Sequence, residues 1–187
     1  MKKSLFFALL LAGAAFSASA QTEQGNFLVG GNLQLNTAKN NTQITVSPNA
    51  GYFFADNFAG GVNLNFGYSK VGQSSVTNSY KTTRFDIGPF ARYYVGTTNL
   101  RPFLHANVDF TSSKTKVTTQ TSTSNGVGYF FGPGVAAFLN RNVALEGLIG
   151  YDHFAYKNQE GSGGLALKVG FQIYLNHAEV KAATTVL

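Results

Sequence analysis

The sequence predicts an all-β fold, an eight-stranded antiparallel up-and-down transmembrane β-barrel preceded by a cleaved signal peptide. The first observation is a series of runs in which apolar and polar residues alternate, most clearly in residues 127–151. Period-two alternation indicates strands with one face in an apolar medium. The second observation is length, because the runs reach the about 9–11 residues that a tilted strand needs to cross a bilayer. Thirdly, long and short connections alternate between the runs, as in outer-membrane barrels.

The N-terminus has the pattern of a secretory signal peptide. Lys2 and Lys3 form the charged start, an apolar segment follows at 5–15, and Ala18-Ser19-Ala20 fits a cleavage site. The apolar segment is too short to cross a membrane as a helix. We therefore divide the chain into a signal peptide at 1–20, a barrel domain at 21–175 and a C-terminal tail at 176–187.

Composition excludes several classes of protein. The 187 residues include no Cys, so neither a disulfide framework nor a lipoprotein acylation site is expected. The formal net charge of +6 includes both signal-peptide lysines, and the remaining excess is scattered, so nucleic acid is not an expected partner. No later segment has eighteen consecutive apolar residues, which argues against helical membrane spans.

The first three strands are predicted at 26–36, 42–53 and 58–70. Their apolar faces carry residues such as Leu33, Val46 and Phe66, and their opposite faces carry mainly Asn, Gln, Ser, Thr and Gly. Pro48 lies on an apolar face and removes one backbone donor, so a local defect in the strand pairing is expected there. A short turn at 55–57 separates the second and third strands.

The next two strands are predicted at 81–95 and 101–112, joined by a short turn at 96–99. The polar linker 72–79 precedes them, and the long Thr/Ser-rich connection 114–125 follows them. Both strands carry ionisable residues on the face opposite their apolar residues. Such residues need a polar or paired environment, which the inside of a barrel supplies.

The last three strands are predicted at 127–139, 143–152 and 164–175. Asn140-Arg141-Asn142 joins the first two as a tight turn, because Asn tolerates left-handed backbone and bonds locally. The segment 155–161 connects to the final strand. Eight strands close into a barrel whose interior is just filled by side chains. The alternative is a soluble lipocalin-like barrel with its apolar face inside, but Tyr and Phe near the strand ends of the apolar faces favour a membrane barrel.

Four segments carry a family resemblance: PNAGYFFADNFAGGVNLNFGYS, FDIGPFARYYV, GPGVAAFLNRNVALEGLIGYD and the closing strand LKVGFQIYL. Through them the chain resembles the OmpA/OmpX-like outer-membrane β-barrel domain family of Gram-negative bacteria. The resemblance implies Sec-type export, a place in the outer membrane in contact with its lipids, and insertion by the barrel-assembly machinery. It implies no cofactor. Twelve residues follow Leu175, so the strand that such machinery reads is not strictly terminal here.

Most ionisable residues fall on the face predicted to line the lumen. Enclosed charges must be paired or solvated, so we expect an ionic network that fills the barrel. A narrow gated channel for ions or small solutes is the alternative, in which exchange of ion pairs opens a pore. The predicted network consists of Arg84, Asp86, Arg92, His105, Asp109, Glu146, Asp152 and Lys168.

Other chemistry has weaker support in the sequence. His153, Glu160 and Ser162 are residue types that a lipid A-modifying enzyme uses, but no motif links them, so no catalytic residue is assigned. Three scattered His residues without Cys predict no metal site. The polar loops are candidate contacts for a host or surface ligand. The expected function is therefore a monomeric outer-membrane barrel with a structural or surface-interaction role, and catalysis is a distant third.

Overall fold

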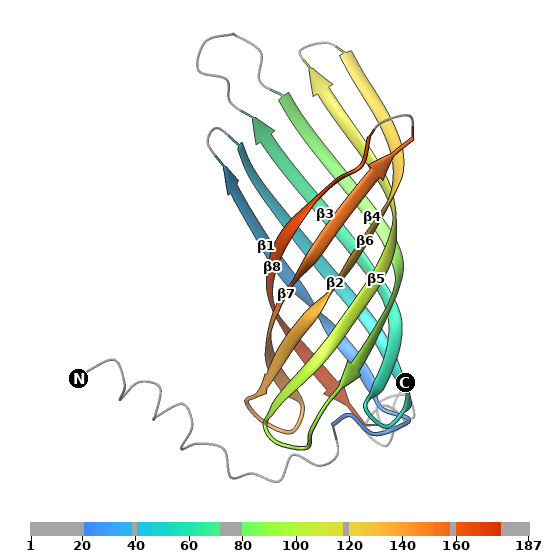
Figure 1. Ribbon diagram of the computed structural model, residues 1–187, viewed down its shortest axis with the longest axis vertical. Coiled ribbons are helices and arrows are strands. Elements are labelled where there is room, and N and C mark those ends of the chain that lie inside the picture. The colour runs from blue at the N-terminus through green and yellow to red at the C-terminus, as the bar shows by residue number, and fades with distance from the viewer. Residues whose placement is uncertain (1–20, 39–40, 72–79, 118–119, 158–159, 177–187) are drawn as a thin grey trace, which may run out of the picture.

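A computed structural model describes residues 21–38, 41–71, 80–117, 120–157 and 160–176. Within these ranges eight antiparallel strands form one closed barrel in chain order (Figure 1). The predicted signal peptide, the linker 72–79 and nearly all of the tail lie outside the described residues. The strands are β1 (Phe27–Ala38), β2 (Asn41–Ala55), β3 (Phe58–Val71), β4 (Tyr80–Tyr94), β5 (Leu100–Val117), β6 (Gln120–Phe138), β7 (Val143–Tyr156) and β8 (Ser162–Leu175).

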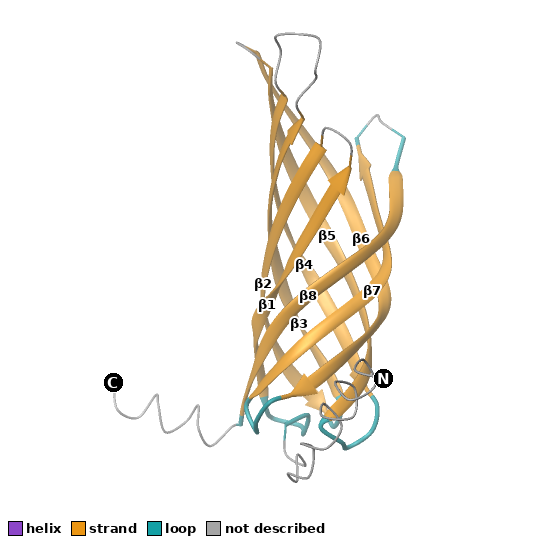
Figure 2. Cartoon of the chain, turned by 90° about the vertical axis from the view of Figure 1, so that its left-hand side faces the viewer, coloured by secondary structure: helices purple, strands orange, loops and turns teal. Residues whose placement is uncertain are grey.

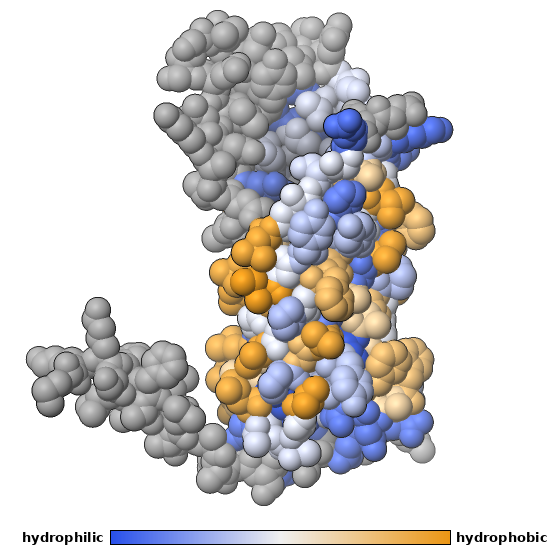
Figure 3. Space-filling view, in the orientation of Figure 1, coloured by the Kyte–Doolittle hydropathy of each residue, from blue (hydrophilic) through white to orange (hydrophobic). Residues whose placement is uncertain are grey.

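The two faces of the strands divide as the alternation predicts, with apolar side chains outside and polar side chains inside. Large exposed side chains such as Val62, Ile87 and Leu104 cover the outer surface, and Figure 3 shows hydrophobic patches along the middle of the face in view. Asn, Ser, Thr and charged side chains are buried in the interior. This is the reverse of a lipocalin, whose apolar face is internal. The soluble alternative is therefore wrong.

Exposed aromatic rings lie near both ends of the outer hydrophobic surface. Phe58 and Tyr93 are close to the ends of their strands at the short turns, and Phe85 and Phe110 lie toward the long connections. Such aromatic girdles mark the two interfaces of a membrane barrel. Among the described residues, no helix has the length and apolar character needed to cross a membrane.

The two ends of the barrel differ in their connections. Short turns join β2 to β3, β4 to β5 and β6 to β7 at the end where β1 starts and β8 finishes (Figure 2). We call this the turn end and the opposite end the loop end. In one turn Asn57 has a φ of 63°, a left-handed conformation that Asn tolerates. In another, the Asn140 side chain accepts bonds from the Asn142 and Val143 amides at 2.8 and 2.9 Å.

The predicted connection 114–125 is largely wrong, because the structure continues β5 to Val117 and begins β6 at Gln120. The strands pair without interruption from Ser112↔Asn125 to Val117↔Gln120. Thr and Ser are frequent in exposed loops, but Thr also favours strands because its side chain is β-branched. The resulting polar hairpin extends the barrel at the loop end.

Three outward-facing prolines interrupt strand pairing. Pairs at Pro48 are missing from the described β2–β3 register, as predicted, although the register is unchanged on either side. Pro89 and Pro133 coincide with similar interruptions in the β4–β5 and β6–β7 pairings. Proline has no backbone N–H, so each ring removes a ladder donor on one side of its strand.

The segment before β1 folds back across the turn end. Gln21 and Thr22 are buried, and the Asn57 amide donates to the Thr22 carbonyl at 2.7 Å. Arg101, itself buried, donates to the Thr22 hydroxyl at 2.6 Å and to the Gln21 side-chain carbonyl at 3.2 Å. This segment thus lies across the turn end of the lumen.

Candidate functional site in the barrel lumen

Five buried aromatic side chains fill the lumen at the turn end. We call them the aromatic plug: Phe53, Tyr94, Phe103, Phe138 and Tyr174. Neighbouring rings lie 4.8 to 6.3 Å apart between centroids, at the tilted and edge-on angles that aromatic pairs prefer. Each side chain lies within a few residues of a strand end, so five strands contribute to one layer. The Tyr174 and Tyr94 hydroxyl oxygens lie 3.1 Å apart, in a hydrogen bond that joins opposite sides of the barrel.

A fully enclosed ion pair lies directly above the plug. The Arg92 Nη1 atom of β4 donates to both carboxylate oxygens of Glu146 on β7, at 3.1 and 2.9 Å, and both side chains have 0% exposure. The Tyr174 hydroxyl also donates to Glu146 at 3.0 Å. The guanidinium carbon of Arg92 lies 5.1 Å from the Phe103 ring centroid. The carboxylate therefore has several donors, which is what a buried charge requires.

A chain of hydrogen bonds continues from this ion pair toward the loop end. Arg92 Nε donates to His105 Nδ1 at 2.9 Å, so the proton of a neutral ring is on Nε2. That nitrogen lies 3.1 Å from the Asn107 side-chain oxygen, and Asn107 donates to Asp109 at 2.6 Å. The amides of Asn63 and Asn65 also donate to Asp109, at 2.7 and 3.1 Å.

The remaining predicted charges lie nearer the loop end. Arg84 and Asp86 pair at 3.0 Å between Nε and Oδ2, and the Arg84 guanidinium stacks 3.8 Å from the Phe154 ring centroid. The Lys168 ammonium lies 3.8 Å from the Phe130 ring centroid, in a cation–π contact. Asp152 and Asp109 are the carboxylates that interact electrostatically with Lys168. All eight predicted residues thus lie on the lumen side: four form the two direct ion pairs, His105 and Asp109 belong to the hydrogen-bonded chain, and Lys168 and Asp152 interact electrostatically.

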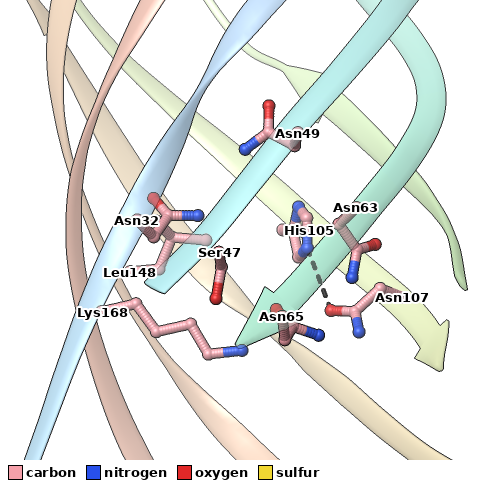
Figure 4. A pocket seen from close by; sticks show the side chains of 9 residues that line it. All are labelled: Asn32, Ser47, Asn49, Asn63, Asn65, His105, Asn107, Leu148 and Lys168. Atoms are coloured by element: carbon pink, nitrogen blue, oxygen red, sulfur yellow. Dashed lines mark hydrogen bonds between the residues drawn. The ribbon is translucent and has the colours of Figure 1, made fainter. Parts of the chain in front are cut away.

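A small polar cavity remains among these side chains (Figure 4). Its volume is about 20 Å³, enough for one water molecule. Three amide oxygens at its wall, those of Asn32, Asn49 and Asn63, are buried and lack a hydrogen-bond partner. In Figure 4 Asn32 on β1 lies on the side of Lys168 and Leu148, Asn63 on β3 lies near His105, and Asn49 on β2 points away from Lys168. The lining residues are Asn32, Ser47, Asn49, Asn63, Asn65, His105, Asn107, Leu148 and Lys168.

Sequence reasoning missed the aromatic plug and Arg101. The plug residues lie on the lumen-facing side of the alternation, where we expected polar groups. A signal was available, because each aromatic stands close to a predicted turn. The partners of Arg101 are 79 and 80 positions away, at Thr22 and Gln21, so no local pattern indicates them.

The residues considered for other chemistry are not brought together. His153 stacks against Tyr129 on the outer surface, with 4.9 Å between ring centroids. Within the described part of the chain, no hydrogen bond joins His153 to Glu160 or Ser162. In the same ranges no group of three His, Cys, Asp or Glu side chains is arranged to hold a metal ion.

Known proteins share this architecture. The chain resembles Neisserial surface protein A, with a TM-score of 0.57, 16% identity, and coverage of 82% of this chain and 97% of that one. OprG from Pseudomonas aeruginosa gives a TM-score of 0.54 at 10% identity, covering 84% and 99%. A major outer membrane protein from Thermus thermophilus gives 0.51 at 13%, covering 80% and 98%.

At these identities the likeness shows the fold alone. No curated protein sequence gives a significant match. The family comparison is more extensive, because the description "Outer membrane protein beta-barrel domain" matches residues 6–180, nearly the whole chain. Together with the closed eight-stranded barrel, this match shows that the chain belongs to the outer membrane protein beta-barrel domain family.

Proposed function

We propose that this protein is a structural outer-membrane barrel whose lumen does not conduct, and that its loop end is a surface for interaction. The turn end faces the periplasm in this proposal, as short turns do in related barrels. The observation that carries it is the sealed turn end. Arg92 and Glu146 are without solvent exposure above the aromatic plug.

The seal has three successive layers. The segment with Gln21 and Thr22 crosses the turn end, the aromatic plug follows, and the Arg92–Glu146 pair lies above it. A conducting path would have to break contacts in each layer. Opening would separate the buried Arg92–Glu146 pair and take each charge away from its partner, so this layer opposes spontaneous opening.

Conductance in planar bilayers tests this proposal. The natural protein should produce no stable current steps. The double variant Phe138→Ala/Tyr174→Ala removes two adjacent plug rings, the Tyr174 bond to Glu146 and the ring against which Arg101 packs, so it weakens all three layers and should admit a small current. Heat-modifiability on a gel checks that both barrels are folded. Stable steps from the natural protein that change in Lys168→Ala would instead favour the gated channel.

The polar hairpin at the loop end supports the interaction role. Residues of the extended β5–β6 pair include exposed Lys114, Lys116 and Thr121, which project beyond the outer hydrophobic surface. The hairpin can be shortened in register by replacing 113–124 with Asn-Gly, because Ser112 pairs with Asn125. Cells carrying this variant should lose binding to immobilised host glycans or proteins while the barrel stays heat-modifiable. Binding that is absent in the natural protein, or unchanged in the variant, would contradict the role of the hairpin.

A further inference from the structure

The seam between β1 and β8 closes only in its lower part. The two strands form seven residue pairs, from Phe27↔Leu175 to Leu33↔Val169. Above that point both strands continue, since β1 pairs with β2 up to Ala38 and β8 pairs with β7 from Ser162. Across these described residues no β1–β8 pair forms. In Figure 1 the upper part of β1 rises beside β2, whereas β8 bends toward β7.

The open part of the seam lies within the outer hydrophobic surface. Leu165 and Leu167 on β8 face outward with 78% and 64% exposure. Their strand edge is therefore at the depth of lipid chains. Unpaired backbone N–H and C=O groups are strongly unfavourable in lipid and are tolerated where protein or a polar cavity satisfies them. The unpaired backbone N–H and C=O groups of this edge therefore need hydrogen-bond partners.

An apolar groove runs along the outside of the closed part of the same seam. Its volume is about 490 Å³, within the range of about 300–1,000 Å³ for small-molecule sites. Gly31 forms its floor, because it places no side chain between Val29 and Leu33. Pro48 and Phe171 stand on either side of that glycine. The lining residues are Val29, Gly30, Gly31, Asn32, Leu33, Val46, Pro48, Val169, Gly170, Phe171 and Ile173.

Asn32 connects this groove to the lumen. It contributes to the wall of the outer groove and also to that of the polar cavity. Its side chain is 8% exposed, and its amide oxygen has no hydrogen-bond partner. A Cβ atom on Gly170 would meet the Asn32 amide oxygen, so this glycine leaves space for the amide at the seam.

We propose that the β1–β8 seam binds a single-chain amphiphile with an uncharged, hydroxyl-bearing head group. The acyl chain lies in the groove over Gly31, between Val169 and Val46. One hydroxyl of the head group lies at the seam and donates to the unpartnered amide oxygen of Asn32, the residue that lines both the groove and the cavity. This site is separate from the structural role proposed above, because it depends on no contact of the plug.

The chemistry of the cavity selects the head group. The amide oxygen of Asn32 has no partner, and an oxygen of this kind accepts hydrogen bonds but donates none. Hydroxyl groups supply the matching donors, whereas a carboxylate supplies only further acceptors. Lys168 also lines the cavity, but Asp109 and Asp152 already act on its charge, so an anionic head group would not meet an unpaired cation there.

Native mass spectrometry of protein released from detergent micelles tests the proposal. Monoolein, methyl oleate and oleate share one acyl chain and differ in the head group. Monoolein should form a saturable one-to-one complex, with an affinity about tenfold above methyl oleate, since an unsatisfied buried acceptor costs about one such factor. Oleate should bind no better than methyl oleate.

Matched variants separate the groove from the general lipid surface. Val169→Trp fills the groove and should lower monoolein affinity at least about tenfold. Val108→Trp places the same ring on an outward-facing position away from the groove and should have no effect. Asn32→Ala should remove the preference for monoolein over methyl oleate. Val46→Trp, on the opposite wall, replaces Val169→Trp if that variant fails to become heat-modifiable.

Four results would overturn the site. Non-saturable binding, or equal affinity in the Val169→Trp and Val108→Trp variants, would mean that lipid simply coats the barrel. Stronger binding of oleate than of monoolein would exclude the assigned head group. A preference for monoolein that survives in Asn32→Ala would place the head group elsewhere.

Discussion

Glu146→Ala should destabilise the barrel more than any substitution of an exposed charge. Glu146 is enclosed with Arg92 at 2.9 Å and accepts a further bond from Tyr174 at 3.0 Å. The variant leaves the Arg92 guanidinium buried without its counter-charge, which costs about 3–5 kcal/mol. The double variant Arg92→Met/Glu146→Leu removes both charges and should lose no more than about 2 kcal/mol, chiefly the donor to His105.

Urea unfolding in phospholipid vesicles measures this difference, with the fraction of the fast-migrating folded band as the signal. The slope of the free energy against urea should be unchanged, so that the midpoint reports stability alone. Glu160→Ala, at an exposed position near the loop end, is the control and should change the free energy of unfolding by less than about 0.5 kcal/mol.

Comparing the single and double variants separates the cost of the unpaired Arg92 charge from the cost of lost packing. A loss below about 1 kcal/mol in Glu146→Ala would mean that water reaches Arg92, as at a surface ion pair. The seal proposed for the turn end would then fail as well. A double variant as unstable as the single variant would mean that packing, and not the unpaired charge, dominates at this layer.

Three further predictions concern other parts of the barrel. Arg101→Ala removes the donors to Thr22 and Gln21 and should make residues 21–24 sensitive to protease while the barrel remains folded. Unchanged cleavage would show that backbone hydrogen bonds alone hold the segment. Gly88→Ala places a Cβ atom 2.7 Å from the Asp109 Cα and should lower the free energy of unfolding by about 1–3 kcal/mol. The control Gly147→Ala meets no atom within 4 Å and should be nearly neutral. Equal losses in the two variants would refute the packing argument. Val108→Arg on the outer surface should cost about 2–4 kcal/mol in vesicles, and Thr123→Arg on the polar hairpin almost nothing; a tolerated Val108→Arg would place that position outside the lipid core.

The faces of the strands were predictable because a membrane barrel imposes one repeating rule. Val62 and Asn63 must point to opposite sides, whatever the register, and they do. Partners inside the lumen were not predictable in the same way. Arg92 and Glu146 were expected in one lumen network, but their direct contact depends on the tilt and closure of eight strands together.

Two other features escaped prediction for distinct physical reasons. The segment 113–124 has a composition shared by loops and exposed strands, and only its cross-strand pairs make it a hairpin. The open seam leaves no trace in the alternation, because the pattern continues through Leu165 and Leu167 as if the strand were paired on both sides. The local sequence indicates which medium surrounds each side chain. It does not indicate which strand pairs with each strand edge.

The Tyr94–Tyr174 contact has a mechanical consequence. It joins β4 to β8, which are opposite strands of the ring, at 3.1 Å, and the Arg92–Glu146 pair adds a second brace from β4 to β7. These braces resist flattening of the circular cross-section at the turn end. The open seam leaves the loop end less resistant to such flattening. When the surrounding bilayer thins or is compressed sideways, the barrel should therefore deform by widening or narrowing near its loop end, while its turn end keeps its shape.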